Sequence, residues 1–143
     1  RNYRIAPEAA GELVTATFES GRTVGLDPIL LVAVMAVESR FNPIAESAVG
    51  AKGLMQVIPQ MHLDKLVHHG GGDVALDPWI NIYVGAQILQ EYIQRGGSLE
   101  AGLQLYNGAS TDETKQYALK VLGEKERIEQ ILPRPQRGRP ANV

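Results

Sequence analysis

The chain has 143 residues, of which 44% are hydrophobic and 21% charged, and its formal net charge is −2. This composition is typical of one globular domain with a single core, and the small charge gives no general attraction to nucleic acid or anionic membranes. Because the sequence contains no cysteine, disulfides, thiol catalysis and thiolate metal sites are excluded, whereas cytoplasm and periplasm both stay open.

The first residues lack an initiator methionine and the apolar region of a signal peptide, so we expect a processed or excised segment of a longer protein. No apolar run approaches the roughly 20 residues that would cross a bilayer, and we expect no transmembrane segment.

A first helix is predicted from Pro7, because proline suits a first turn and apolar residues then recur at helical spacing until Gly21 and Gly25.

A second helix is predicted from Asp27-Pro28 to about Arg40. Asp27 is a suitable N-cap and Pro28 fits the first helical position. Apolar residues fill positions 29–37 without interruption, which is also compatible with a buried strand. The length of the run, its alanines and the cap favour a buried helix.

Glu38 directly follows this run, close to the predicted helix end. Apolar surroundings penalise an ionised carboxylate, and the helix dipole opposes a negative charge at a C-terminus, so both effects favour the protonated form. A carboxylic acid that is protonated near neutral pH can donate a proton in catalysis. The alternative interpretation is an acid at a fraying helix end, with its carboxylate in water.

The middle of the chain alternates loops and helical segments. Residues 43–53 resemble a loop that could line a cleft, residues 60–67 could add a helical turn or two, and the glycines at 70–72 predict a flexible break. Asp77-Pro78 repeats the cap-and-proline signature and predicts a long helix that closes at Gly96-Gly97.

The last third is predicted to be helical as well. Ser98 can cap a helix that ends around Asn107-Gly108, another helix should begin at residues 111–113, and a final one should cover residues 124–132 after Gly123. No region shows the sustained alternation typical of a strand. We therefore predict an all-α domain over residues 1–132, without internal repeats.

Residues 133–143 contain three arginines and several prolines but almost no apolar side chains, and we predict a disordered basic tail. Such a tail could touch an anionic partner, but a linker or a ragged domain end is the favoured interpretation.

Several motifs occur together and in a fixed order. They are the segment 38–43 that starts at Glu38, then Ser47, then the segment 50–56 that ends in Met55-Gln56, and later Leu105-Tyr106-Asn107. Together with Asp77-Pro78, Asn81-Ile82, Gly85 and the Glu113-Thr114 and Tyr117 segment, they resemble the lytic transglycosylase domain of the soluble transglycosylases, a branch of the lysozyme-like superfamily. The resemblance covers roughly residues 27–122 and implies a lysozyme-like helical fold with a substrate groove.

This family cleaves the β-1,4 bond between N-acetylmuramic acid (MurNAc) and N-acetylglucosamine (GlcNAc) in peptidoglycan and leaves a 1,6-anhydroMurNAc end. The resemblance implies that Glu38 is the catalytic acid and later the base, with no cofactor. It also implies that the substrate's own N-acetyl group stabilises the positive sugar centre, in agreement with the lack of an evident second catalytic carboxylate.

The resemblance further implies substrate contacts by residues on several segments. A hydroxyl of Ser47 should lie near the cleaved bond, Gln56 should line the groove, and the Tyr106 hydroxyl should lie close to the catalytic acid. Without the resemblance, each has an ordinary alternative as a loop, surface or core residue. The expected substrate-binding set is Ser47, Met55, Gln56, Tyr106, Asn107, Glu113 and Tyr117, with Ser39 in support.

Two departures from the family pattern bear on substrate preference. Residues 105–109 change the first position of the usual alanine-tyrosine-asparagine-alanine-glycine motif and exchange its last two, and residues 57–59 replace a usual isoleucine-methionine-proline.

A metal site at His62, His68 and His69 is not expected, because adjacent histidines do not share a helix face and no thiol or acidic partner completes it. Trp79 is interpreted as an anchor at a helix start in preference to a sugar platform.

We therefore expect a peptidoglycan lytic transglycosylase that acts on glycan strands in the periplasm or is otherwise exported to the cell wall. Its partners could include a secretion system or another cell-envelope assembly, and no nucleic acid is expected. The alternatives are a hydrolytic lysozyme and a non-catalytic peptidoglycan-binding or assembly module.

Overall fold

The computed structural model describes residues 7–132, so the predicted tail at 133–143 lies outside the described residues. Helices form almost all of the regular structure, and within the described range the only β-type pairing consists of isolated bridges from Lys52 to Glu46 and to Val57. The predicted all-α class is confirmed. The α-helices are α1 (Pro7–Val24), α2 (Pro28–Ser39), α3 (Leu63–Leu66), α4 (Pro78–Gly96), α5 (Leu99–Tyr106) and α6 (Gln116–Ile131), and the 3₁₀ turns are η1 (Pro59–Met61), η2 (Val67–His69) and η3 (Gly72–Leu76).

The three predicted N-caps form as the sequence indicates. The carboxylate of Asp27 accepts a hydrogen bond from a backbone N–H of α2 at 2.9 Å, and that of Asp77 accepts one from α4 at 3.1 Å. The hydroxyl of Ser98 accepts one from α5, also at 3.1 Å. Each cap satisfies a donor that the first helical turn would leave unpaired, which fixes where the helix begins.

The C-terminal region differs from the prediction, because one helix, α6, replaces the expected two. It begins at Gln116, since Lys115 takes a left-handed conformation with φ 56° and the Asp112 carboxylate binds the backbone N–H groups of Thr114 and Gln116. Gly123 does not break the helix. A glycine costs about 1 kcal/mol relative to alanine inside a helix, which is too little to end one whose flanking turns are packed.

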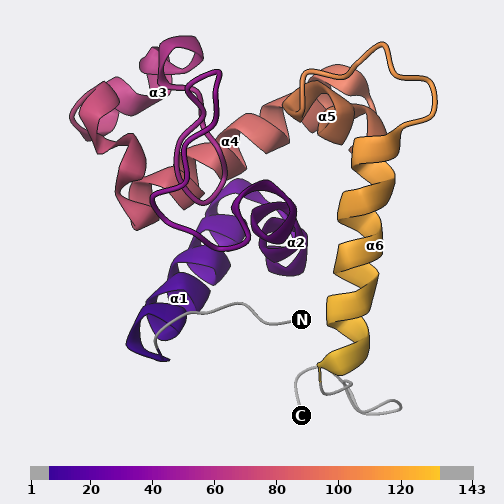
Figure 1. The fold of residues 1–143 in the computed structure, drawn as a ribbon, viewed down its shortest axis with the longest axis horizontal. Helices are drawn as coiled ribbons and strands as arrows, with labels where there is room; N and C mark the ends of the chain where they lie inside the picture. The colour runs from indigo at the N-terminus through magenta and orange to yellow at the C-terminus, as the bar shows by residue number, and fades with distance from the viewer. Residues whose placement is uncertain (1–6, 133–143) are drawn as a thin grey trace.

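The long helices pack against one another in pairs. Helix α2 packs against α1 and α6, while α4 packs against α1 and α5. Figure 1 shows α4 crossing above the α1–α2 pair, with α6 upright on the opposite side of the molecule from α1. Because α2 is apolar around most of its circumference, it is buried in the core of the domain, with Leu31, Ala33 and Val34 fully buried.

Asn81 attaches the loop after α2 to helix α4. Its side chain is 1% exposed, and its oxygen accepts a hydrogen bond from the Met55 backbone N–H at 2.7 Å. Its amide nitrogen donates to the carbonyls of Lys52 at 2.8 Å and Ala75 at 2.7 Å. The segment 52–56 is therefore held on α4 by buried polar contacts rather than by a sheet.

Gly102 sets how closely α5 approaches α4. A Cβ atom at this position would lie 2.5 Å from the Cα of Ile93, so the two backbones can touch only because residue 102 has no side chain. Gly102→Ala is expected to lower the free energy of unfolding by about 1–3 kcal/mol through overpacking. Denaturant unfolding monitored by circular dichroism measures this change.

Gly123→Ala provides the matched control, because a Cβ at this other helical glycine meets nothing within 4 Å. It is expected to raise the free energy of unfolding by about 0.5–1 kcal/mol, owing to the higher helix propensity of alanine. Equal effects of the two substitutions would show that the close α4–α5 contact does not limit stability.

Candidate active site

Glu38 lies in the last turn of α2 and faces an open cavity of about 630 Å³. The side chain is only partly buried, and the residue lines the cavity. The cavity lies between α2 and α6 and extends to the loop after α5; its lining residues are Val37, Glu38, Asn107, Asp112, Gln116, Tyr117, Leu119 and Lys120.

The Glu38 carboxyl group has one hydrogen-bond partner among the described side chains, the Tyr117 hydroxyl. This hydroxyl donates to Oε2 of Glu38 at 2.5 Å, across 79 positions of sequence. Tyr117 itself is 8% exposed and belongs to the core cluster, so packing on α6 fixes its ring. The carboxyl group is therefore held by a side chain with little freedom to move.

Burial raises the pKa of Glu38 above its ordinary value of 4.5. The Tyr117 hydrogen bond and the positive charge of Lys120 both act in the opposite direction, but the loss of hydration outweighs them. The same environment raises the pKa of the Tyr117 hydroxyl, mainly through burial and then through the Glu38 charge, so this hydroxyl keeps its proton. Tyr117 is a hydrogen-bond donor to Glu38 and not a competing base.

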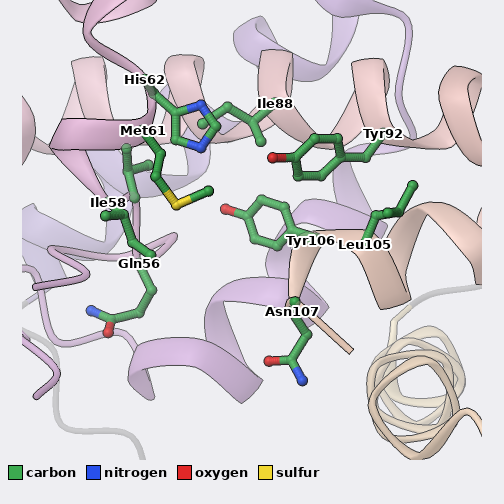
Figure 2. Close-up of a pocket in the computed structure, with 11 residues that line it drawn as sticks. Gln56, Ile58, Met61, His62, Ile88, Tyr92, Leu105, Tyr106 and Asn107 are labelled. Atoms are coloured by element: carbon green, nitrogen blue, oxygen red, sulfur yellow. The ribbon is translucent and has the colours of Figure 1, made fainter. Parts of the chain in front are cut away.

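A second, smaller cavity of about 140 Å³ adjoins the first, and Asn107 lines both. Figure 2 shows the hydroxyls of Tyr92 and Tyr106 pointing toward the side of the cavity where Met61 and His62 lie. The rings of Tyr92 and Tyr106 meet edge to face, with centroids 6.4 Å apart. Because Asn107 lines both cavities, we refer to the two together as the groove, with Glu38 in the larger cavity and His62 in the smaller one.

Tyr106 lies in this groove, but its hydroxyl does not hold Glu38. It donates to the carbonyl of Met55 at 2.6 Å, and Tyr117 makes the hydrogen bond with the acid instead. Burial, followed by the nearby charge of Glu38, keeps the pKa of Tyr106 well above its ordinary value. Tyr106 is thus near enough to respond to Glu38, and it acts as a wall of the groove and as an anchor for residue 55.

The expectation for Met55 requires a correction. Its side chain is 0% exposed and packs against the position where Gly85 leaves room on α4, so it cannot contact a substrate. The backbone of Met55 carries its role, because its N–H donates to Asn81 and its carbonyl accepts from Tyr106. Methionine fills an irregular gap in the core here, as its flexible side chain allows.

Gln56 lines the smaller cavity, as Figure 2 shows at its lower left. Its backbone is left-handed with φ 54°, and its amide nitrogen donates to the carbonyls of Gly53 at 2.9 Å and Ala45 at 3.2 Å. The amide group is therefore oriented by its own loop. Its oxygen accepts no hydrogen bond from the described residues and stays open to a ligand donor.

Ser47 and Ser39 both make local contacts. The Ser47 oxygen accepts hydrogen bonds from the backbone N–H groups of Val49 and Ala51, which shapes the loop, and its proton stays available for a ligand. Ser39 is 8% exposed and donates to the carbonyl of Met35 within α2, so it supports the helix end beside Glu38. Neither belongs to the lining of the two groove cavities.

Glu113 is exposed in the turn before α6, and neither groove cavity includes it. The polar residues that line the larger cavity without having been predicted from the sequence are Asp112, Gln116 and Lys120. Lys120 lies one helical turn after Tyr117, so its place beside Glu38 would have followed from the helical spacing once Tyr117 was placed there.

His62 and His69 contact different parts of the structure. His62 lines the smaller cavity, while the His69 ring meets the Tyr83 ring edge-on with centroids 5.8 Å apart. Among residues 7–132, no group of three His, Asp or Glu side chains could hold a metal ion. None of the helices in this part of the chain is both long and apolar enough to span a membrane.

Comparison with known proteins gives one family. Residues 16–127 match the family model described as Transglycosylase SLT domain. A protein named transglycosylase from Enterobacteria phage PRD1 is 38% identical over 102 residues, which cover 68% of this chain and 37% of the phage protein. A membrane-bound lytic murein transglycosylase C from Actinobacillus pleuropneumoniae is 53% identical over 36 residues, covering 25% of this chain and 10% of that protein.

Two solved structures share the fold. An inactive mutant of lytic transglycosylase Slt from Pseudomonas aeruginosa matches with a TM-score of 0.73 and 23% identity, over 85% of this chain. The 70 kDa soluble lytic transglycosylase of Escherichia coli matches with a TM-score of 0.63 and 26% identity, over 83% of this chain. This chain covers only 24% of each of these larger proteins.

Proposed function

Because the chain belongs to the Transglycosylase SLT domain family, we propose that residues 1–132 form the catalytic domain of a peptidoglycan lytic transglycosylase. The reaction is cleavage of the β-1,4 bond between MurNAc and GlcNAc with formation of a 1,6-anhydroMurNAc end. The observation that carries this proposal is the position of Glu38, which lies in a groove with its pKa raised by burial and with one fixed hydrogen-bond donor.

In the first step, Glu38 acts as the general acid. The bond between the MurNAc anomeric carbon and the GlcNAc oxygen breaks, and this leaving oxygen takes the proton from the Glu38 carboxyl group. A pKa above the ordinary value of 4.5 keeps part of the carboxyl population protonated at a pH where an exposed glutamate is ionised. The positive charge left on the sugar is stabilised by the substrate's own N-acetyl group.

In the second step, the Glu38 carboxylate acts as the base. The C6 hydroxyl of the same MurNAc attacks the anomeric carbon and gives its proton to Glu38, which restores the starting state without consuming water. The Tyr117 hydroxyl, 2.5 Å from Oε2, stabilises the carboxylate between the two steps. One carboxyl group thus suffices for the whole cycle.

The substrate contacts are part of the same proposal. Gln56 and Asn107 offer amide groups to sugar hydroxyls and N-acetyl groups, Tyr106 offers an aromatic wall, and Ser47 offers a hydroxyl proton. Glu113 lies at the surface beyond the α5 end, where a peptide attached to the sugar could reach it. No cofactor is required by either step.

Product masses from purified sacculi test the proposed reaction. The expected muropeptides are one water lighter than those of a hydrolase, because the new end is a 1,6-anhydro ring closed within the MurNAc unit. Ordinary reducing ends would instead identify a hydrolytic lysozyme, and binding without cleavage across a range of pH would identify a non-catalytic peptidoglycan-binding module.

The place of action follows from the substrate. We propose that the domain works on the cell wall after export, in the periplasm of an organism that has one. Local opening of the wall for a secretion system or another envelope assembly is one setting that this chemistry would serve.

Tyr117→Phe tests the role of the hydrogen bond to Glu38. Removing the hydroxyl takes away an interaction that lowers the pKa of Glu38, so that pKa should rise further and the alkaline limb of the pH–rate profile should move to higher pH. The maximal rate is expected to fall by about 10- to 150-fold, because the carboxylate formed in the first step loses a hydrogen bond of roughly 1.5–3 kcal/mol.

Tyr106→Phe is the matched control for this prediction. It removes a hydroxyl that binds the Met55 carbonyl and not Glu38, so the midpoint of the alkaline limb should stay in place. A shift of the same size in both variants would show that the profile responds to the groove in general and not to the Tyr117–Glu38 contact.

A further inference from the structure

The single tryptophan of the chain lies in a cleft outside the groove. Trp79 is 42% exposed, and it lines a cavity of about 210 Å³ together with Glu19, Ser20, Thr23 and Tyr83. This cleft lies between α1 and the start of α4, and it shares no lining residue with the two groove cavities. In Figure 1, α1 lies across the molecule from α6, which carries the Tyr117 side of the groove.

The exposure of Trp79 is not explained by a role as a helix anchor. A large indole left in contact with water forgoes the stabilisation of a buried aromatic side chain. Asp77 and Pro78 already fix the start of α4, since the Asp77 carboxylate accepts the hydrogen bond from Ile80. The side chain of Trp79 is therefore available to contact a ligand in the cleft.

Ser20 offers a hydroxyl that the fold does not use. It is 4% exposed, yet it makes no hydrogen bond with another described residue, whereas Thr15, Thr17 and Thr23 on the same helix all bind a carbonyl four residues back. Every fully buried polar side-chain atom of the described residues is hydrogen-bonded, so the Ser20 oxygen is not sealed in the core. It reaches solvent where the residue lines the cleft.

Glu19 and Tyr83, which also line the cleft, add a carboxylate, a hydroxyl group and an aromatic ring. The Glu19 carboxylate makes no ion pair within residues 7–132 and lies on the same helix turn as Ser20. The Tyr83 ring meets the His69 ring edge-on. Among residues 7–132 its hydroxyl accepts one long hydrogen bond, from Gln87 at 3.5 Å, and can still donate its proton. The cleft thus combines aromatic surface with a carboxylate and hydroxyl groups.

We propose that this cleft is an accessory glycan-binding site that holds one N-acetylated sugar of a peptidoglycan strand. Aromatic side chains pack against the apolar face of a pyranose ring, while the carboxylate and hydroxyls accept and donate hydrogen bonds to its hydroxyl and amide groups. The inference rests on the proposed function for its ligand, since a domain that cleaves a long polymer gains from a second contact with that polymer.

The lining favours a sugar over the other possible occupants. A protein partner would need a contact surface of roughly 800 Å² on this side, whereas the cleft is a small hollow bounded by five residues. A cationic ligand would use Glu19 and the aromatic rings, but it would leave the donor protons of Ser20 and Tyr83 without acceptors. A sugar, with donors and acceptors around an apolar ring face, satisfies all of them.

Tryptophan fluorescence tests the site directly, because Trp79 is the only source of indole emission. Glu38→Gln protein, which should not cleave its ligand, is titrated with an oligomer of four N-acetylglucosamine units. A saturable change of emission is expected. Adding Glu19→Gln, which keeps the side-chain shape, should weaken the fitted affinity roughly three- to tenfold through loss of a charged acceptor.

Co-sedimentation with purified sacculi gives a second readout. Trp79→Ala, in the Glu38→Gln background, should bind sacculi roughly three- to tenfold more weakly, whereas Phe18→Ala should bind as before. Phe18 is the matched control, because it is 46% exposed on α1 but does not line the cleft. With Glu38 intact, Trp79→Ala should still cleave short soluble fragments at the unaltered rate.

Three results would overturn the proposal. One is indole emission that does not respond to the oligomer although the protein still sediments with sacculi. Another is equal weakening by Trp79→Ala and Phe18→Ala, and the last is an emission change with basic peptides but not with the sugar. Failure of the proposed function is distinguishable, because it would remove anhydro products from wild-type digests without silencing the fluorescence titration.

Discussion

Glu38→Gln is expected to lower kcat/KM on sacculi by about 10²–10⁴-fold, the usual contribution of a positioned general acid and base. Glutamine keeps the shape of the side chain and can accept the hydrogen bond from Tyr117, but it can neither donate a proton to the leaving oxygen nor take one from the C6 hydroxyl. Release of soluble muropeptides, quantified by chromatography, measures the loss.

The same substitution should not destabilise the fold. Because the pKa of Glu38 is raised in the folded protein, the folded state holds this proton more tightly than the unfolded state does. The protonated Glu38 carboxyl group therefore contributes to stability at low pH. This contribution decreases as pH rises from the ordinary pKa of 4.5 through the raised pKa of the folded state. The Glu38→Gln variant, which is neutral at this position, should match the wild type at low pH and exceed it in stability at neutral pH.

Glu126→Gln is the control for the rate measurement. Glu126 is an exposed acid on α6, the helix that also carries Tyr117, and it does not line the groove. Its replacement should leave the rate of muropeptide release unchanged. If Glu38→Gln retained more than about a tenth of the wild-type rate, a different group would have to supply the proton.

Asn81→Ala is expected to lower the free energy of unfolding by about 3–5 kcal/mol, among the largest effects of any single substitution in this domain. Alanine would leave the Met55 N–H and the carbonyls of Lys52 and Ala75 without their partner in a site that is 1% exposed. An unpaired buried polar group costs roughly 1–3 kcal/mol, and the deleted side chain adds a small cavity. Denaturant unfolding at neutral pH measures the change.

The effect should extend to the groove, because Asn81 holds the backbone that precedes Gln56 and that binds Tyr106 through Met55. Asn42→Ala is the control, since Asn42 is exposed and its oxygen accepts a single local hydrogen bond, from Ile44 at 3.1 Å. It should cost no more than about 1 kcal/mol. Similar losses for the two variants would mean that the buried contacts of Asn81 add little.

Local signals in the sequence were sufficient for most of the helices. The caps Asp27, Asp77 and Ser98 each act within three residues of their own position, so a pattern of neighbouring residues predicts them well. The prediction was wrong at Gly123, because packing of α6 against α2 outweighs a local helix penalty of about 1 kcal/mol. Tertiary contacts of this kind are not visible in a window of sequence.

The site was less accessible to sequence reasoning, since its geometry depends on contacts between distant segments. Glu38 could be singled out because the apolar run and the acid are adjacent in the chain. Its hydrogen bond to Tyr117 spans 79 positions, and the bond from Tyr106 to the Met55 carbonyl spans 51. Composition and spacing do not distinguish which tyrosine faces the acid or whether Met55 points outward.

Carbon-13 NMR titration of the Glu38 side-chain carboxyl shows whether this group holds a proton above the pH range of an exposed glutamate, with Glu38→Gln used to assign the resonance. We expect a midpoint above the ordinary value of 4.5, and a further upward shift in Tyr117→Phe. A midpoint at or below the ordinary value would contradict this expectation, because Glu38 would then be ionised like any surface acid and could not hold the proton that the leaving sugar requires.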